Sequence, residues 1–560
     1  MNILGLNILN HDTSATLIMG DKIIGMVEEE RFTRNKHERK FPINSIHFLL
    51  KQGNIKEDNI DVITIPYNPW YGMSHLFKYC SKNLIKYMFF FFKQIFKELA
   101  FKKKIKKMII NSLKLNKNCK FLFLEHHLCH AASAFFVSPY KESAILSWDG
   151  RGQWAWLLTA IGRNNKIKIL RKEYIPNSLG QLYESFTHFL GFKGYGDEYK
   201  LMGLSSYGQN KYSDLFNKIV NLEDSKVKIN SKKWKLIVTE SKRENLFKIS
   251  LKELSKFKRN EKEPILKNHK DIACSLQTRV SDIGLKISKN LFQESKLKNL
   301  CIAGGIGQNI LTNQKIYLYS GFKNIYVQPA SHDGGLSLGG ALLVSNLKQN
   351  KKFSMDHACW GPEFNNKEIY NELINHKIKF KKLKNVIKDT AKLITKGKII
   401  GWFQGKSEFG PRALGNRSIL ADPRKSYMKN KVNRIIKFRE VFRPFAPSVL
   451  EEDFNKYFYN SPKNQFMTFS ANVKKNMRKN IPAVTHIDGT ARPQVVSKKN
   501  SLLYWRLIKE FKRITGIGVL LNTSFNVKGE PIVNSPKDAI KCFLLSGLDN
   551  LIIGDYLISK

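Results

Sequence analysis

Acidic residues are scarce in this chain of 560 residues, where 46 Asp and Glu face 95 Lys and Arg for a formal net charge of +49. A surface that binds nucleic acid needs cations gathered into one patch. The lysines are instead spread along the whole chain, beside abundant Asn, Ile and Phe. We therefore interpret the charge mainly as compositional bias and expect no nucleic-acid partner. Anionic small molecules such as ATP and acyl phosphates suit this composition.

Paired cysteines are also missing. The seven cysteines form no C-x-x-C pair and have no regular spacing, which is typical of free thiols in a reducing compartment. Residues 1–8 lack the basic start and long apolar run of a signal peptide. These absences predict a cytoplasmic protein.

The sequence has no long apolar run. Its most apolar segment, 84–101, is interrupted by three lysines and Glu98, well short of the roughly 20 apolar residues of a membrane span. No transmembrane segment is predicted. Two interpretations of the basic stretch at about 78–118 stay open: a helical insertion packed on its domain, which we prefer, and an amphipathic helix on an anionic membrane.

Elsewhere strands alternate with helices, which predicts an α/β fold. Helices are expected near residue 126 and over 271–293, and 209–268 reads as a Lys- and Asn-rich surface region. A polar stretch near residue 353 separates two predicted domains, 1–352 and 353–560, and no internal repeat is found at a period of 20 to 50 residues. The predicted strands are 3–8, 14–19, 23–27, 121–124, 143–148, 300–303, 325–328, 399–404 and 517–521.

Two histidines give the sharpest local pattern. His126 and His130 are four residues apart, so on a helix both imidazoles project from one face and can bind one ion. Asp149, at the end of the next predicted strand, can complete a face of two histidines and one carboxylate that suits Fe(II) or a similar divalent metal. Asp333, on a loop, is a further candidate. The alternative is a pair of histidines with purely structural partners.

Two kinds of segment suggest phosphate binding. Gly304 and Gly305 follow a strand and open a helix, where backbone N–H groups can approach a phosphate, although such a pair of glycines is more often only a tight connection between strand and helix. The second domain offers Arg412 and Arg417 in one segment and Arg443 in another. Arginine forks bind phosphate in a bidentate manner, and Lys437 adds a point charge. Surface salt bridges are the alternative.

Taken together, the motifs resemble the O-carbamoyltransferases of nodulation-factor and antibiotic biosynthesis over nearly the whole chain. The matching blocks follow one another in order: His11–Ala15, Glu28–Phe32, Glu125–Ala132, Gly196–Leu204, Ala303–Gly305, Phe409–Ser418, Phe442–Ser448, Thr485–Arg492 and Asn522–Asn526.

The resemblance implies a fold for each domain. The first is expected to be an actin/Hsp70-like (ASKHA, Kae1-like) carbamoyl-transfer domain. The second is expected to be a YrdC-like α/β domain that makes carbamoyl-adenylate from carbamoyl phosphate and ATP with Mg²⁺. The carbamoyl group then passes to a small-molecule hydroxyl, with a sugar or glycan precursor as the expected acceptor. The oligomeric state stays open, a homo-oligomer included.

By position, the resemblance also implies roles for single residues. His11 is expected to be the base that takes the proton of the acceptor hydroxyl, with core packing as its alternative. The other expected roles are iron ligands (His126, His130, Asp149 and Asp333), nucleotide contacts (Gly304, Gly305, Asn309 and Arg492) and carbamoyl-phosphate ligands (Arg412, Lys437, Arg443 and Ser524).

Two other functions remain as alternatives. A threonylcarbamoyl-type tRNA-modifying enzyme would share the fold and suit the positive charge, but no RNA-binding motif is present. An inactive ATP-binding regulatory protein would be expected to have lost some of these metal or phosphate residues.

Overall fold

The computed structural model describes residues 1–8, 11–81, 85–193, 195–230, 234–236, 247–249, 252–345, 353–437, 439–440 and 442–560. The chain forms two compact units. The first unit comprises Met1–Ile24 and Arg39–Ser354, and the second comprises Gly25–Glu38 and Met355–Lys560. Most of the predicted surface region between 231 and 251 lies outside the described residues.

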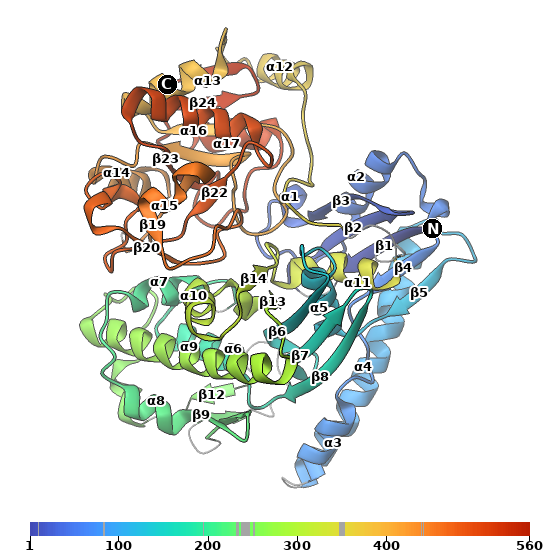
Figure 1. Ribbon diagram of the computed structural model, residues 1–560. Helices are drawn as coiled ribbons and strands as arrows, with labels where there is room; N and C mark the ends of the chain where they lie inside the picture. Colours follow the sequence, from blue (N-terminus) through green and yellow to red (C-terminus); the bar gives the residue numbers. More distant parts are fainter. Residues whose placement is uncertain are drawn as a thin grey trace. The chain divides into compact units, whose positions relative to one another are not determined.

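The first unit contains two five-stranded sheets (Figure 1). One has the strand order β3-β2-β1-β4-β5 and the other the order β8-β7-β6-β13-β14. The bounds of the first set are β1 Asn2–Asn7, β2 Ser14–Met19, β3 Lys22–Glu28, β4 Val62–Ile65 and β5 Lys120–Phe123. Those of the second set are β6 Glu142–Gly152, β7 Ala155–Arg163, β8 Lys166–Tyr174, β13 Asn299–Ala303 and β14 Asn324–Val327. Of β3, the part up to Ile24 belongs to this unit.

The two sheets repeat one topology. In each, the first strand pairs antiparallel with the second and parallel with the fourth, and the fourth pairs parallel with the fifth. Parallel neighbours require crossover connections, and these contain the main helices. Their bounds are α2 Ile43–Gly53, α3 Met73–Ser81, α4 Ile85–Ser112, α9 Lys267–Ser295 and α10 Ile310–Tyr319. Helix α5 (His126–Phe135) instead connects the last strand of one sheet, β5, to the first strand of the other, β6.

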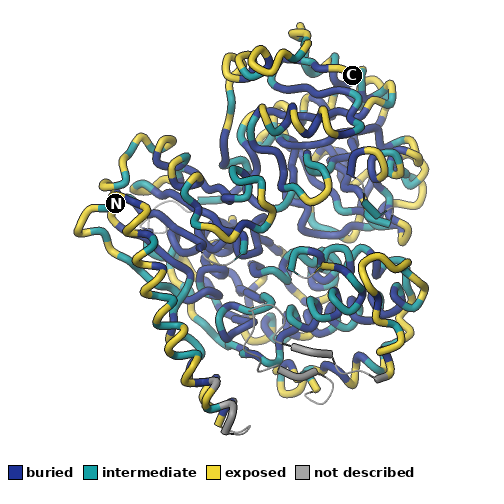
Figure 2. The backbone as a smooth tube through the Cα atoms, turned by 180° about the vertical axis from the view of Figure 1, so that it is seen from behind, coloured by how far each residue is buried: buried dark blue, intermediate teal, exposed yellow. Residues whose placement is uncertain are grey.

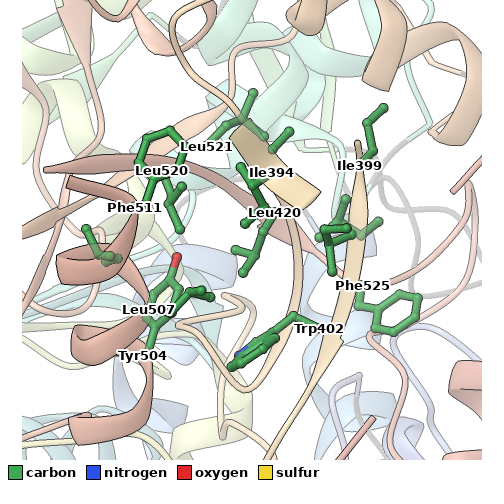
Figure 3. Packing of buried hydrophobic residues seen from close by; sticks show 14 of the residues in the cluster. Ile394, Ile399, Trp402, Leu420, Tyr504, Leu507, Phe511, Leu520, Leu521 and Phe525 are labelled. Carbon is green, nitrogen blue, oxygen red and sulfur yellow. The ribbon is translucent and has the colours of Figure 1, made fainter. Parts of the chain in front are cut away.

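The second unit is built on one eight-stranded sheet of order β15-β25-β24-β16-β17-β23-β18-β22. Its core gathers side chains from the sheet and its helices, among them Trp402, Leu420 and Phe525 (Figure 3). The strands are β15 Lys381–Lys382, β16 Ile400–Phe403, β17 Arg417–Ala421, β18 Ala446–Leu450, β22 Gln494–Val496, β23 Val519–Ser524, β24 Asn550–Ile553 and β25 Tyr556–Ser559. The helices include α12 Asn366–Asn375, α13 Val386–Thr395, α16 Leu502–Thr515 and α17 Pro536–Leu544.

These elements confirm the mixed α/β fold. Strands alternate with helices in both units, and buried residues line the strands while exposed ones follow the outer helices (Figure 2). All seven cysteines are free thiols, as their spacing predicts. Within the described residues, no helix combines the length and apolar composition that crossing a membrane requires.

Candidate active site

Two histidines and two aspartates converge in the first unit. One ligand atom from each of His126, His130, Asp149 and Asp333 lies within 4.8 Å of the others. Nε2 of His130 is 3.2 Å from Oδ2 of Asp149 and 3.5 Å from Oδ1 of Asp333. Nε2 of His126 is 3.6 Å from each of the same two oxygens. The structure therefore brings together all four predicted ligands, which we call the His–Asp cluster.

Close helix packing places Asp333 beside the histidines. Both imidazoles project from α5, and Asp333 begins the short turn Asp333–Gly335 that leads into α11 (Leu336–Val344), which packs on α5. A side chain at Gly339 of α11 would overlap the backbone carbonyl of Cys129 on α5. Glycine therefore permits the short distance between the two helices.

Asp149 lies inside β6, whereas the sequence suggested that the strand ends there. The strand continues to Gly152, and its pairing with β7 is irregular between Trp148 and Gly152. A β-bulge of this kind redirects side chains. A side chain at Gly152 would overlap the ring of His126, so the irregular stretch also leaves room for the first histidine.

The charges of the His–Asp cluster suit a cation. Although burial favours a neutral carboxyl group, His126 and His130 hold the pKa of Asp149 well below its ordinary value. Burial disfavours a charged His130, yet Asp149 and Asp333 raise its pKa. The two carboxylates thus attract positive charge to this place. Two imidazoles and two carboxylates form a donor set that fits a divalent metal such as Fe(II).

His11 borders the same cluster. Its Nδ1 lies 3.3 Å from Oδ2 of Asp12 and 3.5 Å from Oδ2 of Asp333, and its ring stacks on Tyr195 with the centroids 3.6 Å apart. The amide of Asn7 donates to the carbonyl groups of His11 and Asp12, which fixes the turn. Burial lowers the pKa of His11, but Asp333 and Asp12 outweigh it and raise that pKa.

The predicted glycine loop adjoins the cluster. Gly304 has φ +91°, and a side chain there would overlap the carbonyl of Trp148; a Cβ at Gly305 would lie 2.7 Å from Oδ1 of Asp149. Gly304 requires glycine on these grounds, whereas a side chain at Gly305 would displace the carboxylate of Asp149. Asn309 caps α10 by accepting from the N–H of Thr312, and its amide exchanges hydrogen bonds with Gln277. The loop is therefore fixed beside the metal-type ligands.

In the second unit, Lys437 is buried at the end of β23. Its Nζ donates to Oγ of Ser524 at 3.2 Å, to Oδ1 of Asn526 at 2.6 Å and to the carbonyl groups of both residues. Burial, followed by the nearby charge of Arg439, holds the pKa of Lys437 well below its ordinary value. None of these hydrogen-bonding partners is a carboxylate, so the amine of Lys437 can serve as a ligand for an anion.

Four arginines gather near this lysine's segment. Burial, then the charges of Arg412, Arg439 and Arg443, hold the pKa of Arg492 well below its ordinary value. The structure thus brings together the three predicted arginines and adds Arg439, which the sequence analysis missed. Its position two residues after Lys437 was the available signal. Such a concentration of guanidinium groups favours an anionic ligand.

Arg417 has a different role from Arg412, although both occur in one motif. It is fully buried and donates to the carbonyl groups of Gln404, Gly405 and Pro362. Its guanidinium carbon lies 3.6 Å from the centre of the Phe403 ring. Arg417 therefore holds loops of the second unit together, and the surface salt bridge considered for it is not formed among the described residues.

Known protein families match most of the chain. The family described as Carbamoyltransferase N-terminus matches residues 2–342, and the one described as Carbamoyltransferase C-terminus matches residues 391–560. The chain belongs to the carbamoyltransferase family. The two matches confirm the resemblance found in the motifs of the sequence. The protein is therefore an enzyme of the transferase class.

Its relatives include proteins with named roles. Nodulation protein NolNO of Sinorhizobium fredii is 37% identical over 566 residues, which cover 99% of this chain and 80% of that protein. Nodulation protein NolO of Bradyrhizobium diazoefficiens is 38% identical, over 78% of this chain and 79% of that protein. The 3'-hydroxymethylcephem-O-carbamoyltransferase of Amycolatopsis lactamdurans is 31% identical over 46% of this carbamoyltransferase and 48% of that protein.

Proposed function

We propose that the protein is an ATP-dependent O-carbamoyltransferase that makes carbamoyl-adenylate and transfers its carbamoyl group to a hydroxyl of a sugar or secondary metabolite. The observation that carries the proposal is a pair of chemically distinct clusters in one carbamoyltransferase chain. The second unit gathers Lys437 and four arginines. The first unit gathers two imidazoles and two carboxylates beside a glycine loop.

The first step belongs to the cationic cluster of the second unit. Carbamoyl phosphate reacts with water to give carbamate and inorganic phosphate, a carbamate oxygen then bonds to the α-phosphorus of ATP, and pyrophosphate leaves. Lys437, Arg412 and Arg443 would bind the phosphate groups, with Ser524 as a hydrogen-bonding partner. Arg492 would contact the nucleotide. Fixed cations of this kind stabilise the charge that develops on phosphoryl oxygens.

The second step belongs to the His–Asp cluster. His11 would take the proton of the acceptor hydroxyl while the hydroxyl oxygen bonds to the carbamoyl carbon and AMP leaves. Gly304, Gly305 and Asn309 would position the nucleotide, and His126, His130, Asp149 and Asp333 would hold a divalent metal, with Fe²⁺ expected. Such an ion supplies Lewis acidity toward an acyl oxygen. The first unit, with its two five-stranded sheets of one topology, is proposed to be actin/Hsp70-like (ASKHA, Kae1-like). The second unit is proposed to be YrdC-like.

The name of the cephem relative supports a hydroxyl as acceptor, since that protein is an O-carbamoyltransferase. A sugar or glycan precursor is the acceptor implied by the resemblance of the motifs to the O-carbamoyltransferases of nodulation-factor biosynthesis. We therefore place the carbamoyl group on an alcohol rather than on an amine.

Pyrophosphate release tests the proposal. Purified, metal-loaded protein with ATP is expected to release pyrophosphate only when carbamoyl phosphate is present. Lys437→Ala should lower this rate at least about 100-fold, while Lys425→Ala, which removes an exposed lysine, should leave it unchanged. Failure of the natural protein to release pyrophosphate would contradict the proposal. Release that requires threonine and bicarbonate instead would favour a threonylcarbamoyl-type enzyme.

A further inference from the structure

One face of α4 exposes phenylalanines and lysines together. Phe89, Phe92 and Phe96 are 75%, 52% and 72% exposed. Their spacing of three and four residues places them in one stripe along the helix. The same stripe continues through exposed lysines toward the end of the helix. We call this stripe the basic aromatic face, and it contains Phe89, Phe92, Lys93, Phe96, Lys97, Lys103, Lys104 and Lys107.

The opposite face of α4 holds the helix on the first unit. Phe91, Ile105 and Ile109 are buried, and the ring of Phe91 packs edge-on against Phe77 of α3, with centroids 5.2 Å apart. The helix therefore has its own packed side, and the exposed phenylalanines are additional to it. Figures 1 and 2 both show α3 and the neighbouring half of α4 projecting from the rest of the first unit.

Acid is almost absent from α4. Glu98 is the one acidic residue in its sequence and is half-buried, off the basic aromatic face. The basic aromatic face itself therefore contains lysines and no acidic residue. The lysines attract an anionic partner, and burial of the adjacent phenylalanines in an apolar phase would be favourable.

We propose that the basic aromatic face docks on an anionic lipid membrane. An interfacial helix of this type inserts its aromatic side chains at the boundary between headgroups and acyl chains, while its lysines contact anionic headgroups. The projection of the helix gives the face access to a flat surface. The three exposed phenylalanines form a continuous apolar stripe beside the lysines, which favours the bilayer as the partner.

Vesicle flotation with the full chain tests the docking. The protein is expected to float with vesicles that contain phosphatidylglycerol, to remain unbound with pure phosphatidylcholine, and to dissociate as salt is added. Two variants remove the two components of the face separately. The aromatic variant carries Phe89→Ser, Phe92→Ser and Phe96→Ser, and the lysine variant carries Lys103→Gln, Lys104→Gln and Lys107→Gln.

Each variant should weaken vesicle binding at least about tenfold. A matched control removes three exposed lysines from the region of α13 (Lys388→Gln, Lys392→Gln and Lys396→Gln), and it should change binding less than about threefold because those lysines are not on the docking face. Release of pyrophosphate should be the same in all variants, so this test and that of the proposed function fail independently.

Several outcomes would overturn the proposal. These are no flotation of the natural protein at low salt, equal loss in the control, or unchanged binding in both α4 variants. Loss of self-association or of RNA binding in the α4 variants, without vesicle binding by the natural protein, would assign the face to a second copy or to a nucleic acid instead.

Discussion

The four side chains of the His–Asp cluster form a site whose charge depends on what it holds. Ionised Asp149 and the raised pKa of His130 indicate that protons take the place of a cation when the site is free of metal. Metal binding should therefore displace protons and become stronger as pH rises through the pKa of His130.

Replacement of the histidines should remove the metal. In His126→Ala/His130→Ala, bound iron or manganese is expected to fall at least about tenfold, because half of the donor set is lost. Metal content after gel filtration measures this, and the melting temperature should no longer rise on addition of Fe²⁺. His47→Ala, which removes a histidine with a side chain 59% exposed, serves as the control. Equal metal content in both would contradict the assignment.

Glu198 links a single carboxyl group to the pH dependence of stability. Burial, and then the neighbouring Glu184, raise the pKa of Glu198 from 4.5 to about 8. The folded pKa lies above the unfolded one, so the stability due to this proton is complete below pH 4.5 and is lost as pH rises through 8.

Glu198→Gln should remove that loss. The variant is expected to be more stable than the natural protein above pH 8 by up to about 5 kcal/mol, and equal to it at pH 4 or below. Urea unfolding at a series of pH values measures the difference. Glu223→Gln, at an exposed position, should show no such crossover, and a parallel curve for Glu198→Gln would refute the expected pKa.

At the scale of elements, the short segment Gly25–Glu38 supports the second unit. Arg31 is buried, pairs with Glu28 at 3.1 Å and donates to the carbonyl of Gly410 at 2.6 Å. Gly410 is two residues from Arg412. Arg31 therefore fixes the turn that presents a proposed phosphate ligand.

Arg31→Met should destabilise the second unit and weaken phosphate binding. Loss of the guanidinium leaves Glu28 buried without this partner, which costs about 3 kcal/mol. We expect a lower urea midpoint and a higher KM for carbamoyl phosphate. Arg34→Met removes hydrogen bonds to the carbonyl groups of Pro531 and Ile532, farther along the chain from Arg412, and should lower stability without the same rise in KM.

The turn after β13 depends on Gly304. Gly304→Ala adds a methyl group at positive φ that would overlap the carbonyl of Trp148, so we expect a stability loss of about 3 kcal/mol or more and loss of carbamoyl transfer. Gly20→Ala also has positive φ but would meet no atom within 4 Å; it should cost about 1 kcal/mol and keep activity. Thermal unfolding and transfer assays compare the two, and equal effects would contradict the steric explanation.

At the scale of the whole molecule, the proposed clusters belong to different units, so the two half-reactions should be separable. His126→Ala is expected to keep pyrophosphate release within about threefold while transfer to an alcohol falls at least about 100-fold. Lys437→Ala should abolish both, because transfer depends on the adenylate. Radiolabelled carbamoyl phosphate follows both steps. Loss of pyrophosphate release in His126→Ala would indicate a single shared site.

The sequence alone determined the local structure and the chemistry of separate motifs. The periodicity of apolar residues and the position of turn residues predicted β1, β2 and α9 closely. The four-residue spacing placed His126 and His130 on one helical face. These features depend on neighbours within a few residues, which the sequence displays directly. The repeated topology of the two sheets is not visible as a repeat in the sequence. Strand order constrains which positions are buried, and it does not require particular residues at those positions.

Only the tertiary structure decided which distant residues share a site. Asp333 reaches His126 because α11 packs closely on α5 at Gly339, and Arg31 belongs to the second unit through its bond to Gly410. Arg412 and Arg417 look alike in one motif, yet one joins a cluster of arginines and the other holds buried carbonyl groups. Contacts between residues far apart in the chain decide which of these side chains share a site. The residues adjacent in sequence do not reveal those contacts.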